Sequence, residues 1–231
     1  MEKLVILHVL CEGQTEAEFV KHVLSPYLRQ YNIITKNILL NTSQKKKAQG
    51  GLISYQQVKR DLRLLMKQES SKTGEIHCFT TMFDFYALPN DFPGYGEASV
   101  IHDSYQKVAM LEKSFKEDIS HSHFIPYIQL HEFETLLFCG IEQLAQKYHE
   151  CDREIRKLNN VLAEHKGNPE LVNDGTDTAP SKRIINAIND TYHYDKPRTG
   201  REITEQIGIN TLKEKCRHFS EWIEKLEQVI S

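Results

Sequence analysis

The sequence predicts an α/β protein with a mainly parallel sheet flanked by helices and a helical C-terminal portion. Apolar runs rich in β-branched residues alternate with segments of helical periodicity through residue 138, and such runs are typical of strands covered on both faces. This alternation predicts right-handed βαβ crossovers. From residue 140 onward only helical patterns follow. We therefore expect an α/β core over residues 1–139 and a helical portion over residues 140–231 that packs on it.

The first predicted strand covers residues 3–11, "KLVILHVLC", and a helix follows almost at once. Thr15 is a suitable N-cap for this helix, with Glu18 at the capping-box position three residues later. Pro26 is expected to kink or shorten the far end of the helix, because proline has no backbone N–H to donate. The apolar residues on one face of this helix are Phe19, Val20, Val23, Leu24 and Leu28.

The remaining elements of the core continue the alternation. Residues 32–42 and 75–85 are the second and third predicted strands, and residues 123–130 are the fourth. Helices over about 54–68 and 104–118 connect them. In the C-terminal portion the predicted helices cover residues 141–149, 152–165, 181–191, 201–206 and 211–229.

The composition gives no global indication of a polyanion or membrane partner. The formal net charge is −3, so any nucleic-acid site must be local, and the 39% hydrophobic content is sufficient for a core. The five cysteines are scattered and form no CxxC pair, which favours reduced core thiols over disulfides or zinc ligands. The chain shows no charged-then-apolar leader and no apolar stretch of about 18 residues, so we expect a cytoplasmic protein.

Acidic residues follow two of the predicted strands. Glu12 comes directly after the first strand, and Asp84 lies at the end of the third. Because the carboxyl ends of neighbouring parallel strands meet at one crevice, the two carboxylates are expected to lie close together. A hard divalent cation such as Mg²⁺ would explain the proximity of like charges and would stabilise an in-line phosphodiester displacement. The alternative is that each acid is solvated or caps a helix.

Glu132 and Glu134 add to this pattern after the fourth strand. If the strand persists through "LHEFE", the two carboxylates point the same way, whereas if a helix has begun, His131 and Glu134 become neighbours. The sequence leaves both possibilities open. His131 is a candidate ligand or base, or a residue that orients a neighbour.

Basic residues mark a second kind of candidate site. Ser181 is a suitable N-cap, which places Lys182 and Arg183 in the first turn of a helix, where the helix dipole disfavours cations. The turn is either a phosphate clamp, formed with the backbone N–H groups of the helix start, or a solvated basic turn. The run "KKK" at 45–47 is likewise either a solvated loop or a phosphate contact.

Several common catalytic motifs are absent from the sequence. No GxxxxGK[ST] is present, so ATP hydrolysis by this chain is not expected, and no GxGxxG follows a strand. The sequence also lacks a GxSxG elbow and an HExxH pair among its 11 histidines.

Four stretches together resemble a known family. These are "CEGQTE", "TTMFDFYALP", "PYIQLHEFETLLF" and "TAPSKRI", and the resemblance runs from about residue 4 to the C-terminal "CRHFSEWIEKLE". They are similar to a bacterial family of unknown function with a TOPRIM-like fold, often encoded beside an AAA or ABC-type ATPase and associated with phage defence. TOPRIM domains also form the nuclease part of overcoming-lysogenization-defect proteins.

The resemblance implies roles for particular residues. TOPRIM domains hold Mg²⁺ with a glutamate after the first strand and an Asp-x-Asp after a later one. Glu12 would be that glutamate, as metal ligand or general acid/base, with Glu16 a further contributor, and Asp84 would be the first aspartate. Tyr86 stands where the second aspartate is expected, and Glu132 and Glu134 are our candidates to replace it.

Two functions of different classes follow from these observations. One is a nuclease that depends on Mg²⁺ or Mn²⁺ and cuts DNA or RNA, acting as the effector of an ATPase-coupled antiphage system. The other is a catalytically degenerate TOPRIM scaffold that binds an ATPase partner or nucleic acid without cutting. A third reading keeps the metal site but assigns phosphoryl or nucleotidyl transfer on a small nucleotide.

Overall fold

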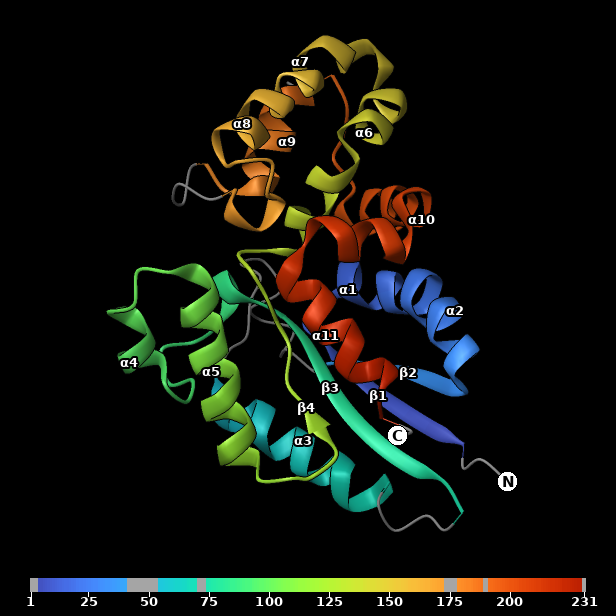
Figure 1. The fold of residues 1–231 in the computed structure, drawn as a ribbon, viewed down its shortest axis with the longest axis vertical. Coiled ribbons are helices and arrows are strands. Elements are labelled where there is room, and N and C mark those ends of the chain that lie inside the picture. The colour runs from blue at the N-terminus through green and yellow to red at the C-terminus, as the bar shows by residue number, and fades with distance from the viewer. Residues whose placement is uncertain (1–3, 41–53, 70–73, 173–177, 189–190, 230–231) are drawn as a thin grey trace.

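The computed structural model describes residues 4–40, 54–69, 74–172, 178–188 and 191–229 of the chain. The run at 45–47 lies outside these ranges. Within them a parallel sheet is flanked by helices, which confirms the predicted α/β class (Figure 1).

The sheet has the strand order β2-β1-β3-β4, with β5 pairing the end of β3. All of its pairings are parallel, and Val5 at the start of β1 lies opposite both Ile33 and Ile76. The central strands β1 and β3 are buried along almost their whole length, as their continuous apolar sequences predict. The strands are β1 (Val5–Cys11), β2 (Ile33–Leu39), β3 (Ile76–Asp84), β4 (Phe124–Ile125) and β5 (Ile128–Gln129).

The fourth predicted strand is divided into two short pieces. Pro126 lies between β4 and β5 and cannot donate to the ladder. At this break, threonine side chains of β3 form hydrogen bonds with the backbone in place of the strand ladder. The Oγ1 of Thr81 accepts a hydrogen bond from the N–H of Tyr127 at 3.0 Å, and the Oγ1 of Thr80 donates to the carbonyl of Ile125 at 2.6 Å. The interruption therefore leaves the backbone polar groups satisfied.

One face of the sheet is covered by helices from both ends of the chain. Alternate residues of β1, such as Val5, Leu7 and Val9, join the core on this side. Trp222 stacks on Tyr127 with ring centroids 4.1 Å apart. Figure 1 shows α10 and α11 lying beside α1 and α2 on this face, so the core is continuous across residue 139. The elements are α1 (Gln14–Phe19), η1 (Val20–Leu24), α2 (Ser25–Leu28), η2 (Arg29–Tyr31), α10 (Lys196–Lys215) and α11 (Arg217–Glu227).

The first helix begins differently from the prediction. Its N-cap is Gly13 rather than Thr15, and Glu16 rather than Glu18 occupies the third helical position. The Oε2 of Glu16 accepts a hydrogen bond from the N–H of Gly13 at 2.8 Å. The expected N-cap was wrong because the strand and the helix are joined by a tighter turn than the Thr15 cap would require. Ahead of Pro26 the helix widens into the single π turn η1.

The other face of the sheet carries α3 (Tyr55–Glu69) and α5 (Ser104–Ile119). Phe115 of α5 contacts Phe124 at a ring separation of 4.9 Å and Phe92 at 5.0 Å. These aromatic contacts fill the layer between α5 and the sheet. The short elements nearby are η4 (Phe85–Ala87) and α4 (Tyr95–Ser99).

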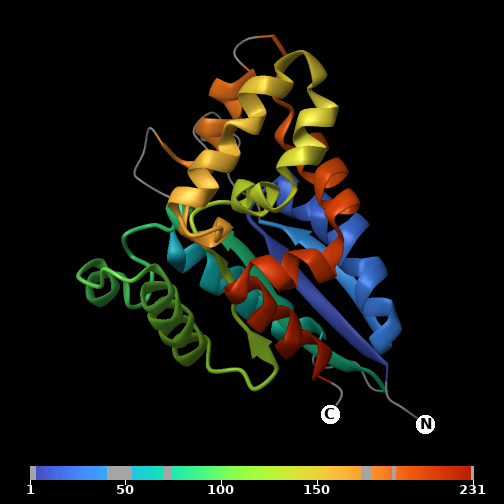
Figure 2. The same cartoon turned by 45° about the horizontal axis from the view of Figure 1, so that its top comes forward.

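A group of helices stands beyond the carboxyl ends of the strands, and we call it the upper lobe (Figures 1 and 2). The 3-10 helix η5 (Phe133–Gly140) leads from the sheet into it. The lobe contains α6 (Ile141–Lys147), η6 (His149–Cys151), α7 (Asp152–Arg156), α8 (Leu158–Glu164) and α9 (Pro180–Ile188), and η7 (Pro169–Leu171) follows α8. Among the described residues no helix combines the length and apolar character needed to cross a membrane.

The helix α10 starts earlier than the predicted helix at 201–206. Asp195 caps it by accepting from the N–H of Arg198 at 3.1 Å, and Gly208 interrupts it with a φ of 75°. Gly200 lies where α10 meets α1 and η5. A Cβ at this position would lie 2.8 Å from Cε1 of Phe133 and 3.0 Å from Cγ2 of Thr15. The close approach of three elements therefore depends on the missing side chain.

A buried carboxylate, Glu170, holds the N-terminus of α11. Its two oxygens accept from the N–H groups of His218 and Phe219, each at 3.0 Å. The hydroxyl of Tyr105 donates to the same carboxylate at 2.9 Å. This arrangement satisfies two N–H groups of the first helical turn and places a negative charge at the positive end of the helix dipole.

Candidate functional site

The acids after β1 and β3 lie side by side at the carboxyl edge of the sheet. The register places Cys11 opposite Met82, so each strand ends at nearly the same level. The Oε2 of Glu12 accepts a hydrogen bond from the N–H of Asp84 at 3.0 Å. The structure therefore brings together the two residues that the strand ends single out. Burial, followed by the charge of Glu16, raises the pKa of Glu12 to about 8.

The carboxylate of Asp84 is the member of this group that has a buried oxygen without a hydrogen-bond donor among the described residues. Its Oδ1 is inaccessible to solvent and has no hydrogen-bond partner among the described residues. Burial raises its pKa well above the ordinary value, and the charges of Glu16, Glu12 and Glu134 raise it further. A buried acceptor without a donor costs free energy unless a ligand supplies what is missing.

Glu16 approaches the same edge from the first turn of α1. Its side chain is 5% exposed, and its carboxylate is held by the N–H of Gly13. Burial raises its pKa to about 7 although backbone hydrogen bonds oppose this, and the charge of Glu134 contributes. The helix N-terminus positions this acid next to the strand-end pair.

Glu132 and Glu134 reach the site from the turn after β5. The strand ends at Gln129 and η5 begins at Phe133, so neither the persistent strand nor the early helix describes this stretch. His131 adopts a left-handed φ of 64° and Glu132 is extended. This local bend sends both glutamates toward Lys196. His131 is not their neighbour, since its Nε2 lies 2.9 Å from the carbonyl oxygen of Glu170.

The carboxylate of Glu132 serves as the cap of α9. Both of its oxygens accept from Ser181, one from the backbone N–H and the other from the hydroxyl at 3.0 Å. Ser181 was predicted to be the N-cap itself. That prediction was wrong because α9 already begins at Pro180 and an acid from another element performs the capping. Lys182 is exposed in this first turn, and the Nε of Arg183 donates to the carbonyl of Thr178 at 2.7 Å.

Lys196 supplies positive charge at this edge and was not identified from the sequence. Its Nζ lies 3.0 Å from Oε1 of Glu134 and 3.9 Å from Oε2 of Glu132. Partial burial lowers its pKa, but Glu134 and Glu132 outweigh this and leave it raised, so the ammonium stays protonated. The sequence "YDKP" is the signal from which Lys196 could have been predicted. An aspartate with a proline two residues later indicates the start of a helix, and the lysine between them then lies in the first turn.

His131 and Tyr86 border the site rather than enter the carboxylate group. Burial lowers the pKa of His131 to about 4, so its imidazole is neutral at physiological pH. The rings of Tyr86 and His131 lie 5.5 Å apart, and the N–H of Tyr86 donates to the carbonyl of His131 at 3.0 Å. This places Tyr86, at the position of the missing second aspartate, against the turn that carries Glu132 and Glu134.

We call Glu12, Glu16, Asp84, Glu132, Glu134 and Lys196 the acidic cluster. Among the described residues no three of its carboxylates bring oxygens within 4.8 Å of one another. A divalent cation would therefore be held by one or two of them, with water and substrate oxygens in the remaining positions, which is the usual arrangement for Mg²⁺. Asp84, whose Oδ1 is unpaired within the described ranges, and the adjacent Glu12 are the pair that fits this role.

The cluster lies within the part of the chain that a protein-family model matches. The family is described as a domain of unknown function, DUF4276, and the match covers residues 11–227. The chain belongs to the DUF4276 family. Neither a curated protein nor a solved structure matches it. The DUF4276 match begins one residue before Glu12 and includes every residue of the acidic cluster.

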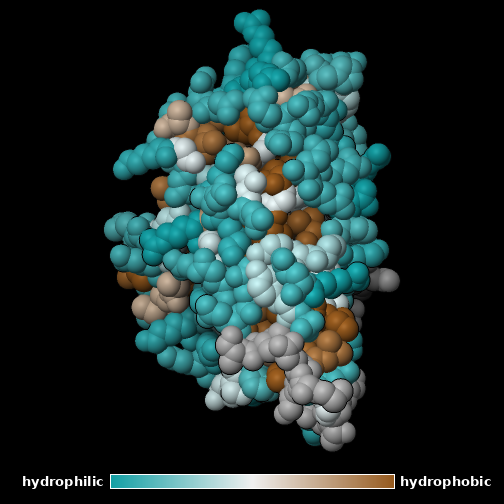
Figure 3. Space-filling view, turned by 45° about the vertical axis from the view of Figure 1, so that its right-hand side comes forward, coloured by the Kyte–Doolittle hydropathy of each residue, from teal (hydrophilic) through white to brown (hydrophobic). Residues whose placement is uncertain are grey.

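A groove of this DUF4276 chain lies elsewhere, between α5 and α11. It measures about 860 Å³ and is lined by charged residues of both signs, among them Lys113, Lys116, Glu221 and Lys225. Its lining also includes the ion pair of His218 and Glu112, whose Nε2 and Oε1 lie 3.0 Å apart, and it contains none of the carboxylates of the acidic cluster. The face shown in Figure 3 is mainly hydrophilic, with apolar residues in separate patches.

Proposed function

We propose that this DUF4276 protein is a divalent-cation-dependent phosphodiesterase that hydrolyses DNA or RNA at the acidic cluster. The observation that carries the proposal is Asp84, whose buried Oδ1 has no hydrogen-bond partner in the described part of the chain, while four glutamates lie at the same edge of the sheet. Five carboxylates gather around one lysine, and burial together with mutual repulsion raises the pKa of Glu12, Glu16 and Asp84, so their ionisation is costly without a counter-ion. Mg²⁺ or Mn²⁺ would displace their protons and offset the charge of the ionised carboxylates, and substrate phosphate would complete the coordination.

Each side chain of the acidic cluster has a proposed role that follows from its position. Glu12 and Asp84 would hold the cation, which supplies Lewis-acid polarisation of the phosphodiester and a more acidic bound water. Lys196 is a cation beside the carboxylates and would contact a non-bridging phosphate oxygen. Glu16, fixed by the N–H of Gly13, would accept the proton of the attacking water. Lys182 and Arg183 follow Ser181, which touches Glu132, and would bind a neighbouring phosphate.

The test is a cleavage assay with the full chain and labelled single- and double-stranded DNA and RNA, in Mg²⁺ or Mn²⁺. We expect cleavage that is lost in Glu12→Gln and Asp84→Asn and retained in Glu97→Gln, a control at an exposed glutamate. Circular dichroism checks folding of each variant. Cleavage that persists in both cluster variants would disprove the assignment of the site.

A second candidate function is a binding scaffold that does not cut. Lys196 already provides a positive charge 3.0 Å from Glu134, and Tyr86 occupies the position where a further acid is expected. A Mn²⁺ titration separates the two functions. Binding that Glu12→Gln and Asp84→Asn both weaken favours the enzyme, whereas the scaffold predicts no site-dependent binding even when nucleic acid is present.

The partner and the biological setting stay predictions. The resemblance to TOPRIM proteins implies an AAA or ABC-type ATPase partner and a role in phage defence. Transfer of a phosphoryl or nucleotidyl group on a small nucleotide would use the same cluster with a different substrate. Assays with mononucleotides, in parallel with the nucleic acids, distinguish these substrates.

A further inference from the structure

A second group of potential metal ligands lies on the face of the sheet that α3 covers, away from the carboxyl edge of the strands. His8 is in β1, His77 is near the start of β3, and Glu69 is the last residue of α3. His8 lies opposite Phe79 in the register, two residues beyond His77, so both imidazoles project from the same face of adjacent strands. We call these three residues the histidine cluster.

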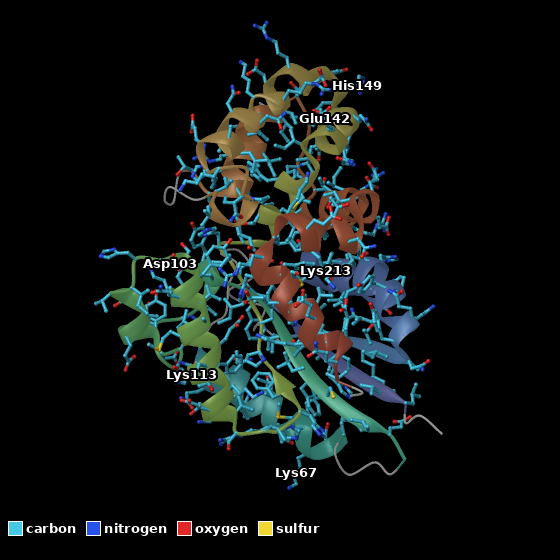
Figure 4. All side chains as sticks on the ribbon, viewed as in Figure 1. Lys67, Asp103, Lys113, Glu142, His149 and Lys213 are labelled. Carbon is cyan, nitrogen blue, oxygen red and sulfur yellow. The ribbon has the colours of Figure 1, made fainter. Side chains whose placement is uncertain are left out.

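The histidine cluster and the acidic cluster lie at different levels along the strands, since His8 precedes Glu12 by four residues and His77 precedes Asp84 by seven. Figure 4 shows Lys67, two residues before Glu69, at the lower end of α3, while Glu142 and His149 mark the upper lobe. The acidic cluster lies between the sheet and that lobe, since Glu132 caps α9. The two groups therefore share no side chain and are separated along the strands.

The ligand atoms of the histidine cluster converge on one point. Nε2 of His8 lies 3.0 Å from Nδ1 of His77, and Oε2 of Glu69 lies 3.6 Å from each of them. In a tetrahedral zinc site, metal–ligand bonds of about 2.0–2.1 Å separate neighbouring ligand atoms by about 3.3–3.4 Å. The three observed separations bracket this value. Among the described residues this is the one group whose three ligand atoms lie within 4.8 Å of one another.

The surroundings hold these ligands in place. His8 is 1% exposed and its ring stacks on Phe79 with centroids 5.0 Å apart. His77 is 5% exposed, and its Nε2 lies 3.4 Å from Oε2 of Glu75. A carboxylate behind a ligating imidazole fixes its tautomer and raises its basicity, as is common around protein-bound metals. Nε2 of His77 has no hydrogen-bond partner among the described residues, and Glu75 is the nearby carboxylate that could accept from it when the other ring nitrogen binds an ion.

We propose that His8, His77 and Glu69 bind a divalent transition-metal ion, for which Zn²⁺ is the best fit. Two imidazole nitrogens and one carboxylate are typical zinc ligands, whereas Mg²⁺ prefers oxygen ligands. Neutral imidazoles and one carboxylate leave the bound ion with a net charge of +1, which Glu75 partly offsets. A water molecule would complete the tetrahedron.

The bound ion would fasten three elements that are far apart in the sequence. It would link β1, β3 and the last turn of α3. Because the folded chain gathers these ligands and an unfolded chain does not, the metal stabilises the folded state as its concentration exceeds the dissociation constant. This role is independent of the proposed phosphodiesterase.

The experiment uses the full chain, stripped with a chelator and titrated with Co²⁺ and then Zn²⁺. We expect one equivalent of Co²⁺ to give the visible absorption of tetrahedral N/O coordination, Zn²⁺ to displace it, and Zn²⁺ to raise the melting temperature. Glu69→Gln and His77→Gln should weaken binding by at least about tenfold. The matched controls His123→Gln, at an exposed histidine, and Glu12→Gln should keep the visible absorption of tetrahedral Co²⁺.

The outcomes separate the proposal from a metal-free hydrogen-bonded cluster. Absence of the Co²⁺ spectrum, or binding that Glu69→Gln leaves unchanged, would overturn the zinc site. Glu69 lies at the end of a helix and its replacement conserves shape, so this variant decides the question if His77→Gln fails to fold. An unchanged tetrahedral Co²⁺ spectrum in Glu12→Gln shows that this signal does not depend on the acidic cluster.

Discussion

Replacing Glu12 by glutamine should stabilise the cation-free protein at pH 8 and have much less effect at pH 5. The substitution removes a charge that the acidic cluster disfavours. The side-chain carbonyl of glutamine still accepts the hydrogen bond that the N–H of Asp84 gives to Glu12. The variant therefore isolates the electrostatic cost of ionising this side chain.

The size of the expected stabilisation follows from the pKa of Glu12, which is about 8 in the folded chain against an ordinary 4.5. A raised carboxyl pKa means that folding favours the neutral acid, so this stability is complete below pH 4.5 and is lost as pH rises through 8. At about 1.4 kcal/mol per unit, ionisation costs about 4 kcal/mol at pH 8 and under about 1 kcal/mol at pH 5. Solvent screening of this partly buried group and its coupling to Glu16 reduce the expected gain to about 2 kcal/mol.

The assay is urea unfolding of wild type and Glu12→Gln at pH 5 and pH 8, with a chelator present. Glu97→Gln is the control, since it removes an exposed carboxylate. Adding Mg²⁺ at pH 8 should stabilise the wild type and narrow the difference between the two proteins. An equal effect at both pH values, or a less stable Glu12→Gln at pH 8, would refute the electrostatic reasoning.

Other predictions concern the supports of the fold. Glu170→Ala should lower the free energy of unfolding by about 3 kcal/mol, because two N–H groups of α11 lose their acceptor, and urea titration measures it. Gly200→Ala should cost about 1–3 kcal/mol because the new Cβ would meet Phe133, and a wild-type melting temperature would contradict this. His218 has a raised pKa beside Glu112 despite burial, so its stabilisation is complete below pH 6.5 and is lost as pH rises through the folded pKa. The stability difference between wild type and His218→Gln should therefore shrink between pH 6 and pH 9.

The parts of the fold that local pattern controls were predictable from the sequence. The buried strands β1 and β3 were predicted from their apolar runs, and the helices α3 and α5 were predicted from their periodicity. The break between β4 and β5 was missed because it depends on threonines of a neighbouring strand as much as on Pro126. The start of α10 was missed although Asp195 and Pro197 provided a local signal.

The site was predictable only where chain topology controls it. The proximity of Glu12 and Asp84 follows from two parallel strands ending at one edge. The capping of α9 by Glu132 joins residues 49 positions apart, and no local pattern encodes such a pair. His8 and His77 gave a weak signal as polar residues inside otherwise apolar strands, but their convergence with Glu69 depends on how α3 packs.

The cap that Glu132 provides has a thermodynamic consequence for the upper lobe. A cation that took Glu132 as a ligand would compete with Ser181 for the same two oxygens. Ligand binding at the sheet edge and attachment of α9 would then be linked with opposite signs, and the linkage acts equally in both directions. A partner that pressed α9 onto the sheet would thereby withdraw Glu132 from the cation, so one carboxylate would let contacts on the lobe regulate the acidic cluster.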